Sequence, residues 1–450
     1  MKSEFRYQSW ASDHNDNSLA FKFEHLTRTG ERYEFVETLR FPVEVKTDGI
    51  GKVLCDMLHI ALGLSYYKAF LPPEIKHPYA LTEEEAAFWN EVLQNGMAEF
   101  VMRNKLPFTC LALFHAQSGS RASILERPSL REIPLLGFGG GKDSIVAGEL
   151  LKQIGRPPIT FVLASGRHTG KIEAAAAVMG SPEFTVERHI DHRILGLNTR
   201  SDVYNGHVPF SLFLALIGTL LAYSNNQAWF CVGNEASANI ASATWNGKIV
   251  NHQWSKSFRF ELIFNALLSR IHPELQYFSV IRPFTSVAIG RMLSRFQEYF
   301  PFFTSDSGSM RQEAVRRPVD RWPVESPKTL STFFLLAPWL GEADLVTIFG
   351  RNLLDEQDLL PTVESLFGLS GERPMDCVGT AVELKACCAA VAQRPELSQK
   401  PLMKAALAKH PELSDPVSFP IVPHLAVRLD SCLPASISSQ IKSAGLAFLQ

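Results

Sequence analysis

Residues 133–144, with the sequence IPLLGFGGGKDS, predict the fold of this chain. The first six residues are mostly apolar and predict a short buried strand, and the glycines that follow predict a turn. From Asp143 onward the pattern is that of a helix. A strand that leads through a glycine turn into a helix lets backbone N–H groups approach an anion at the positive end of the helix dipole. The segment therefore predicts a phosphate-binding loop.

Strand and helix patterns continue to alternate after this loop. Short apolar runs predict strands at Ile159–Ala164 and Trp229–Val232, and helix-like patterns cover Lys171–Met179, Val208–Tyr223 and Phe258–Ser269. Alternating elements of this length predict an α/β fold with a parallel sheet and helices on both faces. Ligands of such sheets bind at the carboxyl ends of the strands.

Three regions are predicted along the chain. Residues 1–132 are expected to form a small α+β domain with antiparallel strands and two helices, the second beginning with a capping box at Thr82 and Glu85. Residues 133–326 are expected to form the catalytic α/β domain, and residues 327–450 a largely helical C-terminal region.

The composition is that of an ordinary globular protein, with 46% hydrophobic and 20% charged residues in a chain of 450. A formal net charge of −2 provides no basic excess for binding nucleic acid. The seven cysteines are scattered and none forms a C-x-x-C pair, which indicates a reducing compartment and no structural zinc. The most apolar run, Val208–Tyr223, is shorter than the roughly 20 residues of a spanning helix, and the N-terminus lacks a signal-peptide pattern. We therefore expect a cytoplasmic protein with no membrane or nucleic-acid partner.

Two common phosphate-binding motifs do not fit the glycine loop. A P-loop NTPase requires Ser or Thr after Gly-Lys, but Asp143 follows Lys142 here. The dinucleotide motif G-x-G-x-x-G requires a third glycine at the position of Lys142. A tight turn that binds no ligand remains an alternative.

The stretch Gly139–Ser144 resembles the S-G-G-x-D-S signature of the PP-loop ATP pyrophosphatases, with Gly139 in place of the first serine. The resemblance implies an adenine nucleotide alpha hydrolase-like sheet, cleavage of ATP between its α- and β-phosphates, and transfer of AMP to a substrate. It also implies ATP and Mg²⁺ as cofactors, held by residues on several loops. The implied contacts are the ATP phosphates at Gly139, Gly140, Gly141, Lys142 and Ser144, adenine near Ala164, a phosphate or substrate carboxylate at Arg282, and Mg²⁺ at Asp143 and Glu235.

These charged side chains also have structural interpretations. Lys142 could be a solvated lysine at a helix N-terminus, and Asp143 would be favourable there because of the helix dipole alone. Glu235 could be the neighbour of a helix cap, and Arg282 could form a structural salt bridge.

Four segments taken in order resemble a narrower family, the ATP-dependent UDP-N-acetylmuramoyl-L-alanyl-L-glutamate epimerases of bacteria. The segments are Gly139–Ser144, Val232–Asn239, Asn251–Ser257 and Cys377–Thr380. The resemblance covers the whole chain. It implies that the terminal L-glutamate of a UDP-linked muramoyl dipeptide is converted to D-glutamate through an acyl-adenylate, with release of AMP and pyrophosphate, in peptidoglycan precursor synthesis.

Such a reaction needs a base that removes the α-proton, and the sequence leaves its identity open. His252 and Lys256 share a polar loop and either could move a proton at neutral pH. His168 is a second candidate, and Cys377 is a third. For any one histidine a structural or solvated role is the alternative.

Two other functions share the activating residues. A PP-loop ligase or amidotransferase would couple the adenylate to an amine. A regulatory nucleotide-binding protein would bind ATP without turnover, and the presence of Asp143 and Ser144 disfavours it. Sulfur transfer is disfavoured because residues 322–329 contain no cysteine. Three arginines could attract the acidic substrate or be solvated in a polar connector: Arg121, Arg127 and Arg131.

Overall fold

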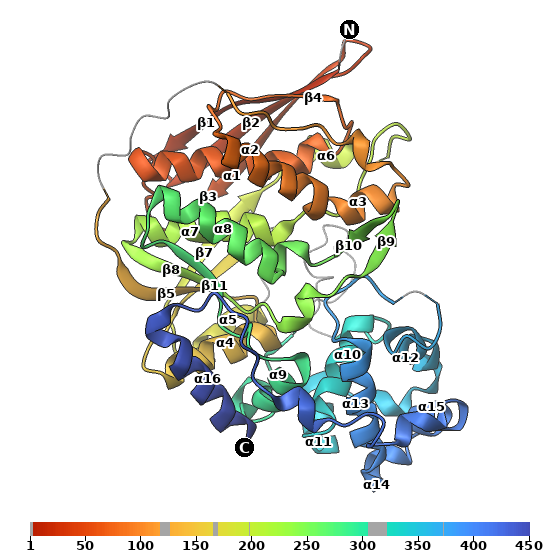
Figure 1. Cartoon of the computed structure of the whole chain (residues 1–450). Coiled ribbons are helices and arrows are strands. Elements are labelled where there is room, and N and C mark those ends of the chain that lie inside the picture. Colours follow the sequence, from red (N-terminus) through yellow and green to blue (C-terminus); the bar gives the residue numbers. More distant parts are fainter. Residues whose placement is uncertain (1–2, 118–126, 165–169, 198, 305–321, 372) are drawn as a thin grey trace.

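One nine-stranded sheet runs through the molecule, and helices cover it (Figure 1). The chain is seen in a computed structural model, which describes residues 3–117, 127–164, 170–197, 199–304, 322–371 and 373–450. The fold is mixed α/β with a large, mostly parallel sheet, as the alternating strand and helix patterns predicted.

The strand order is β11-β8-β5-β6-β7-β3-β2-β1-β4, and a hairpin of β9 and β10 stands apart. The strands are β1 (Glu4–Asp13), β2 (Ser18–Leu26), β3 (Arg32–Arg40), β4 (Glu74–Lys76), β5 (Arg131–Gly137), β6 (Ile159–Ala164), β7 (Glu183–His189), β8 (Gln227–Val232), β9 (Ala243–Trp245), β10 (Lys248–Val250) and β11 (Gln276–Ser279).

The parallel part of the sheet has the order β7-β6-β5-β8-β11. The first of these strands in the chain, β5, lies at the centre, and the order reverses between β5 and β8. In doubly wound sheets the ligand crevice lies at such a reversal, outside the carboxyl ends of the strands. The fold therefore directs attention to the loops that follow β5 and β8.

The N-terminal strands extend this same sheet. β3 pairs antiparallel with β7, where Leu39 lies opposite Arg188. Beside this pairing, Arg188 Nε donates to Glu37 Oε1 over 2.6 Å, and both side chains are buried. The strands before and after residue 132 thus belong to one continuous sheet.

Helices lie on both sides of the parallel strands, with α7 and α8 on one side and α4, α5, α9 and α16 on the other (Figure 1). The helices are α1 (Gly49–Tyr67), α2 (Glu83–Glu91), α3 (Ala98–Arg103), α4 (Lys142–Gln153), α5 (Gly170–Met179), α6 (His192–Leu197), α7 (Phe210–Ser224), α8 (Phe258–Ile271), α9 (Ser286–Leu293), α10 (Pro327–Leu336), α11 (Glu342–Phe349), α12 (Leu360–Leu366), α13 (Ala381–Ala392), α14 (Pro395–Ser398), α15 (Pro401–Lys409) and α16 (Ala435–Leu449).

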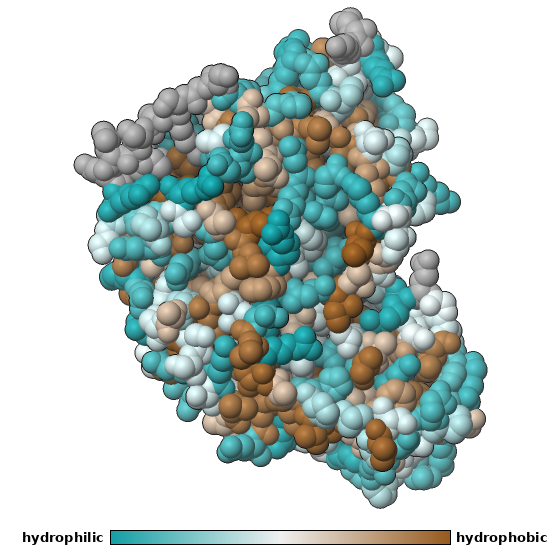
Figure 2. Space-filling view, in the orientation of Figure 1, coloured by the Kyte–Doolittle hydropathy of each residue, from teal (hydrophilic) through white to brown (hydrophobic). Residues whose placement is uncertain are grey.

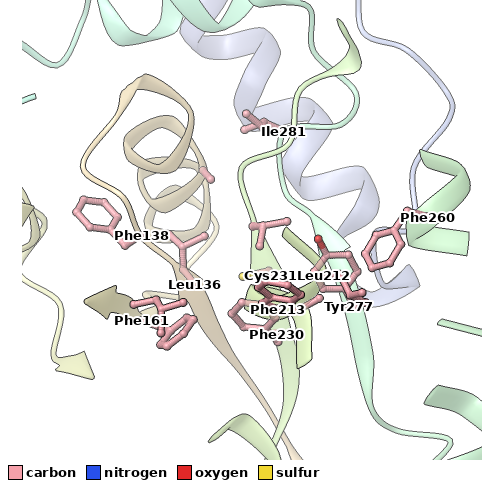
Figure 3. Close-up of a cluster of buried hydrophobic side chains, with 14 of the residues drawn as sticks. Leu136, Phe138, Phe161, Leu212, Phe213, Phe230, Cys231, Phe260, Tyr277 and Ile281 are labelled. Atoms are coloured by element: carbon pink, nitrogen blue, oxygen red, sulfur yellow. The ribbon is translucent and has the colours of Figure 1, made fainter. Parts of the chain in front are cut away.

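The core of the parallel sheet is a cluster of aromatic and aliphatic side chains (Figure 3). Neighbouring strands contribute Leu136, Phe161, Phe230 and Tyr277, and Phe230 packs edge-on against Phe161 with ring centroids 5.7 Å apart. Gly218 of α7 lies against Phe230, since a Cβ at this glycine would come within 2.3 Å of the ring. The close approach of helix and strand therefore requires glycine here.

The region from 327 onward is largely helical, as predicted. α10 packs against α9 and α13, so this region is joined to the sheet domain through α9. On the face in Figure 2, apolar side chains form separate patches among hydrophilic ones. Among the described residues, no helix is both long and apolar enough to cross a membrane.

Replacing Arg188 by Met should destabilise the fold strongly, because it leaves the carboxylate of Glu37 buried without its partner. Loss of one member of a buried ion pair costs about 3–5 kcal/mol. Urea unfolding followed by circular dichroism measures this loss. The matched control is Arg200→Met, which breaks a solvent-exposed pair with Asp202 and should change the unfolding midpoint little. Equal stability of the two variants would contradict the buried link between β3 and β7.

Candidate functional site

The glycine loop joins the end of β5 to the start of α4. Gly140 adopts a φ of +68°, and a Cβ there would lie 3.3 Å from Ile172. Its carbonyl accepts a hydrogen bond of 3.1 Å from the backbone N–H of Thr304. Gly141 is the N-cap of α4 and has no side chain to cap the first turn. The N–H groups at such a helix N-terminus are suited to binding an anion, and phosphate binding here stays a prediction.

The end of β8 approaches α4 closely. A Cβ on Gly233 would lie 2.6 Å from the backbone oxygen of Asp143, so a larger residue would push the two segments apart. Across this contact the ammonium of Lys142 donates to Asp143 over 2.5 Å and to Glu235 over 2.8 Å. Lys142 is 5% exposed. The structure thus places Lys142 between two carboxylates rather than in solvent.

Two carboxylates share one ammonium in this position. Burial raises the pKa of Asp143, and the nearby charge of Glu235 acts in the same direction. Burial opposes ionisation of Glu235, but Lys142 and a hydrogen bond from Ser237 hold its pKa below the usual value. The excess negative charge and the carboxylate oxygens fit a divalent cation such as Mg²⁺.

Arg282 follows β11 and is 1% exposed. Its guanidinium pairs with Glu261 of α8 at 3.0 Å. It also donates to the backbone carbonyls of Glu235, over 2.7 Å, and Lys256, over 2.5 Å. These partners match the structural interpretation of Arg282, and binding a phosphate or a substrate carboxylate would require it to leave them.

Three of the four proton-transfer candidates lie together. Lys256, in a short 3-10 helix (Trp254–Lys256), donates to the sulfur of Cys377 over 3.1 Å. Nitrogen, carboxylate and sulfur atoms of His252, Asp376 and Cys377 lie within 4.8 Å of one another. Cys377 comes from the loop before α13, so the C-terminal region supplies part of the site. His168 lies outside the described residues.

Cys377 differs from the other cysteines in its ionisation. Burial opposes its ionisation, but the charge of Lys256 and a hydrogen bond from His252 lower its pKa to about 6. Burial raises the pKa of all the others, namely Cys55, Cys110, Cys231, Cys387, Cys388 and Cys432. The thiolate in turn raises the pKa of Lys256. At neutral pH the pair is a thiolate beside an ammonium.

Sequence reasoning missed Glu99 and His207. Glu99 of α3 is buried and forms a hydrogen bond with Nδ1 of His252. Nδ1 of His207 lies 3.4 Å from the same carboxylate oxygen, and Arg103 donates to the other one over 2.7 Å. In the sequence, Glu99 and Arg103 have the spacing of an ordinary ion pair on a helix surface, so no local signal marked them.

The electrostatics around His252 follow from these contacts. Burial opposes its protonation, but hydrogen bonds with Cys377 and Glu99 raise its pKa to about 9. Burial lowers the pKa of His207 to about 4. A carboxylate oxygen of Glu99 and ring nitrogens of His207 and His252 lie within 4.8 Å of one another. Nδ1 of His252 and Nδ1 of His207 both lie beside one carboxylate oxygen of Glu99, so the three side chains form one largely buried polar cluster.

The glycine-loop carboxylates and the Cys377 cluster are neighbours. Arg282 links them, because its guanidinium donates to the backbone carbonyls of both Glu235 and Lys256. Ala164 ends β6, at the same edge of the sheet as the glycine loop.

The connector arginines lie elsewhere. Arg127 donates to the carbonyl of Arg270 and Arg131 to that of Asn225, at the amino end of β5 and away from the crevice. Arg121 is outside the described residues.

Iodoacetamide should alkylate Cys377 faster than any other cysteine at pH 7. Because the pKa of its thiol is lowered to about 6, the rate should be near its maximum at pH 7 and fall as the pH is lowered through about 6. Replacing Lys256 by Met removes the stabilising ammonium and should slow alkylation at pH 7 by about tenfold or more. Peptide mass spectrometry resolves the sites, with half-buried Cys110 as the internal reference. Equal rates at Cys110 and Cys377 would contradict the thiolate assignment.

Comparison with known proteins places this chain in a family. The family model described as MurL N-terminal domain matches residues 1–280, and the one described as MurL C-terminal domain matches residues 306–418. No solved structure matches.

Three relatives carry the name UDP-N-acetyl-alpha-D-muramoyl-L-alanyl-L-glutamate epimerase. The relatives from Micromonospora sp. and Salinispora tropica are 31% and 30% identical over 415 residues, covering 91% of this chain and 91% and 89% of their own lengths. The relative from Xanthomonas oryzae is 30% identical over 391 residues, or 86% of this chain and 85% of its own. The chain therefore belongs to the MurL family.

Proposed function

We propose that this protein is an ATP-dependent epimerase that converts the terminal L-glutamate of UDP-N-acetylmuramoyl-L-alanyl-L-glutamate to D-glutamate through an acyl-adenylate. The chain belongs to the MurL family, and its relatives are named as UDP-N-acetyl-alpha-D-muramoyl-L-alanyl-L-glutamate epimerases, which supports this substrate and overall reaction. The observation that carries the mechanism is the position of the Cys377–Lys256–His252 cluster, which Arg282 connects to Glu235 beside the glycine loop. A group that activates a carboxylate and a group that moves a proton are both needed, and they adjoin here.

Activation is needed because the α-hydrogen beside a carboxylate is a very weak acid. Its removal would place a carbanion next to an existing negative charge. Forming an acyl-adenylate removes that charge and makes the carbonyl electron-withdrawing. Release of AMP and pyrophosphate then drives the reaction forward.

We infer that the glycine loop and α4 form a PP-loop that binds the phosphates of ATP. The N–H groups at the start of α4 and the hydroxyl of Ser144 lie at this loop. The hydroxyl donates a hydrogen bond to the carbonyl of Gly141 over 3.1 Å, and it would donate to a phosphate when ATP is bound. Asp143 and Glu235 would hold Mg²⁺, which when bound neutralises charge on the phosphate oxygens. Lys142 keeps these two carboxylates at a fixed spacing.

We assign proton transfer at the glutamyl α-carbon to the cluster of Cys377, Lys256 and His252. A half-buried thiolate and two adjoining cationic groups can accept and return a proton near neutral pH. ATP and a UDP-linked substrate are both nucleotides of the cell interior, so we place the reaction in the cytoplasm as a step in peptidoglycan precursor synthesis.

Replacing Asp143 by Asn or Ser144 by Ala should lower the exchange of labelled pyrophosphate into ATP by about 10²-fold or more, because each removes a group that faces the phosphates. The exchange is measured with Mg²⁺ and the UDP-linked dipeptide present. Ser269→Ala, on the exposed end of α8, is the matched control. Near-normal exchange in both loop variants, with native circular dichroism spectra, would rule out the PP-loop assignment.

Replacing Lys256 by Met should separate activation from proton exchange, since adenylation depends on the glycine loop and not on this ammonium. We expect pyrophosphate exchange to continue while uptake of solvent deuterium at the glutamyl α-carbon falls by at least about 10²-fold. Lys248→Met, an exposed lysine of β10, is the control. Wild-type deuterium uptake in the Lys256 variant would remove Lys256 from the proton-transfer step.

A further inference from the structure

The side chains of Cys377, Lys256 and His252 contact one another, and this contact limits from which side they can approach a substrate. An epimerase that uses two bases holds them on opposite faces of the α-carbon, so the substrate separates them. Here Lys256 Nζ lies 3.1 Å from the sulfur of Cys377, and His252 lies within 4.8 Å of it. These distances leave no room for a carbon atom between the groups. They therefore approach the substrate from one side, as a single unit.

The arrangement of this unit is that of an activated nucleophile. A nucleophilic thiol stands beside an imidazole, and a third group orients the imidazole through its other nitrogen. Glu99 bonds to Nδ1 of His252, which leaves Nε2 for Cys377. Arg103 holds the second oxygen of Glu99. Glu99 is thus a positioning residue for His252.

We propose that Cys377 attacks the glutamyl adenylate and carries the glutamyl group as a thioester during epimerisation. The inference rests on the proposed function, because the adenylate is the acyl donor. A C–S bond forms at the carbonyl carbon, the bond from that carbon to the phosphate oxygen breaks, and AMP leaves with the electron pair. The sulfur attacks as a thiolate, so no proton is lost from it.

Thioester formation also changes Lys256. The charge of the Cys377 thiolate is the main cause that raises the pKa of Lys256, and burial acts against it. Once the sulfur is acylated that charge is gone, and burial favours the neutral amine. Lys256 gives its proton to the departing phosphate of AMP and then accepts the α-proton, which a thioester carbonyl acidifies.

Hydrolysis completes the cycle. Water adds to the thioester carbonyl with His252 as the proton carrier, and the C–S bond breaks with its electron pair going to sulfur. Before hydrolysis the planar thioester enolate turns its opposite face to Lys256, whose ammonium returns the proton there; the configuration is inverted and Lys256 is left as an amine. One proton of the water restores its ammonium, and the other passes to solvent as the carboxylate ionises.

The experiment looks for the acyl-enzyme directly. Wild-type protein in excess over the UDP-linked dipeptide is mixed with ATP and Mg²⁺, quenched in acid, and measured by intact-protein and peptide mass spectrometry. The variant His252→Gln is measured in parallel, because slower hydrolysis should make the thioester accumulate several-fold. We expect an adduct of the substrate minus water on Cys377, dependent on ATP and released by neutral hydroxylamine. Cys110→Ala is the matched control and should keep the adduct.

Pyrophosphate exchange distinguishes failure of this inference from failure of the proposed function. Cys377→Ser and Cys377→Ala should retain the exchange, which also shows that they fold, and should lose epimerisation. Exchange in the wild type and in His252→Gln with no adduct on either protein would overturn the thioester while leaving adenylation intact. Epimerisation by Cys377→Ala at the wild-type rate would also overturn the thioester and leave adenylation intact. Absence of exchange in the wild type would overturn both.

Discussion

The buried ion pair between Arg282 and Glu261 fixes the position of the glycine-loop carboxylates relative to the Cys377 cluster. Burying a guanidinium and a carboxylate costs desolvation energy, which is recovered only if every donor finds a partner. Arg282 meets this condition by also donating to the backbone carbonyls of Glu235 and Lys256. One side chain therefore fixes the carboxylate beside the glycine loop and the ammonium beside Cys377. Removing it would free both loops and leave Glu261 buried without a partner.

Charges in the crevice are balanced in pairs that the chain brings from distant segments. Lys142 is shared by Asp143 and Glu235, and Lys256 is paired with the Cys377 thiolate. The positive charge of Lys328, in α10, favours the ionised forms of both Asp143 and Cys377. Because each pKa depends on its neighbours, a change of charge at one place alters the others. Such coupling suits the proposed reaction, in which pyrophosphate, AMP and the α-proton leave in sequence.

All three regions of the chain contribute to the cluster around Cys377. Glu99 comes from α3 in the N-terminal region, Lys256 from the segment before α8, and Cys377 from the loop before α13. That loop is held by the capping box of Thr380 and Glu383, and Glu383 also accepts from the backbone of Ser286 at the start of α9. The N-terminal and C-terminal regions thus both contribute residues to the candidate site.

The sequence by itself determined the features that depend on nearby residues. Glycines after a buried strand predicted the loop at Gly139–Gly141, and the alternation of apolar strands with helices predicted the parallel sheet. A capping box predicted the start of α2 at Thr82, because its two hydrogen bonds lie within four residues. The family could also be identified from short motifs. The strands β1 and β7 were not predicted, since their apolar alternation is weak.

Only the tertiary structure decided which charged groups meet. Glu99 and His252 are 153 residues apart, and Lys256 and Cys377 are 121 apart. Hydrophobic periodicity fixes which face of an element is buried, but it does not say which buried face lies opposite another. That choice is made by the packing of the whole sheet and its helices. The low pKa of one cysteine among seven is the result, because it arises from partners that no local pattern reveals.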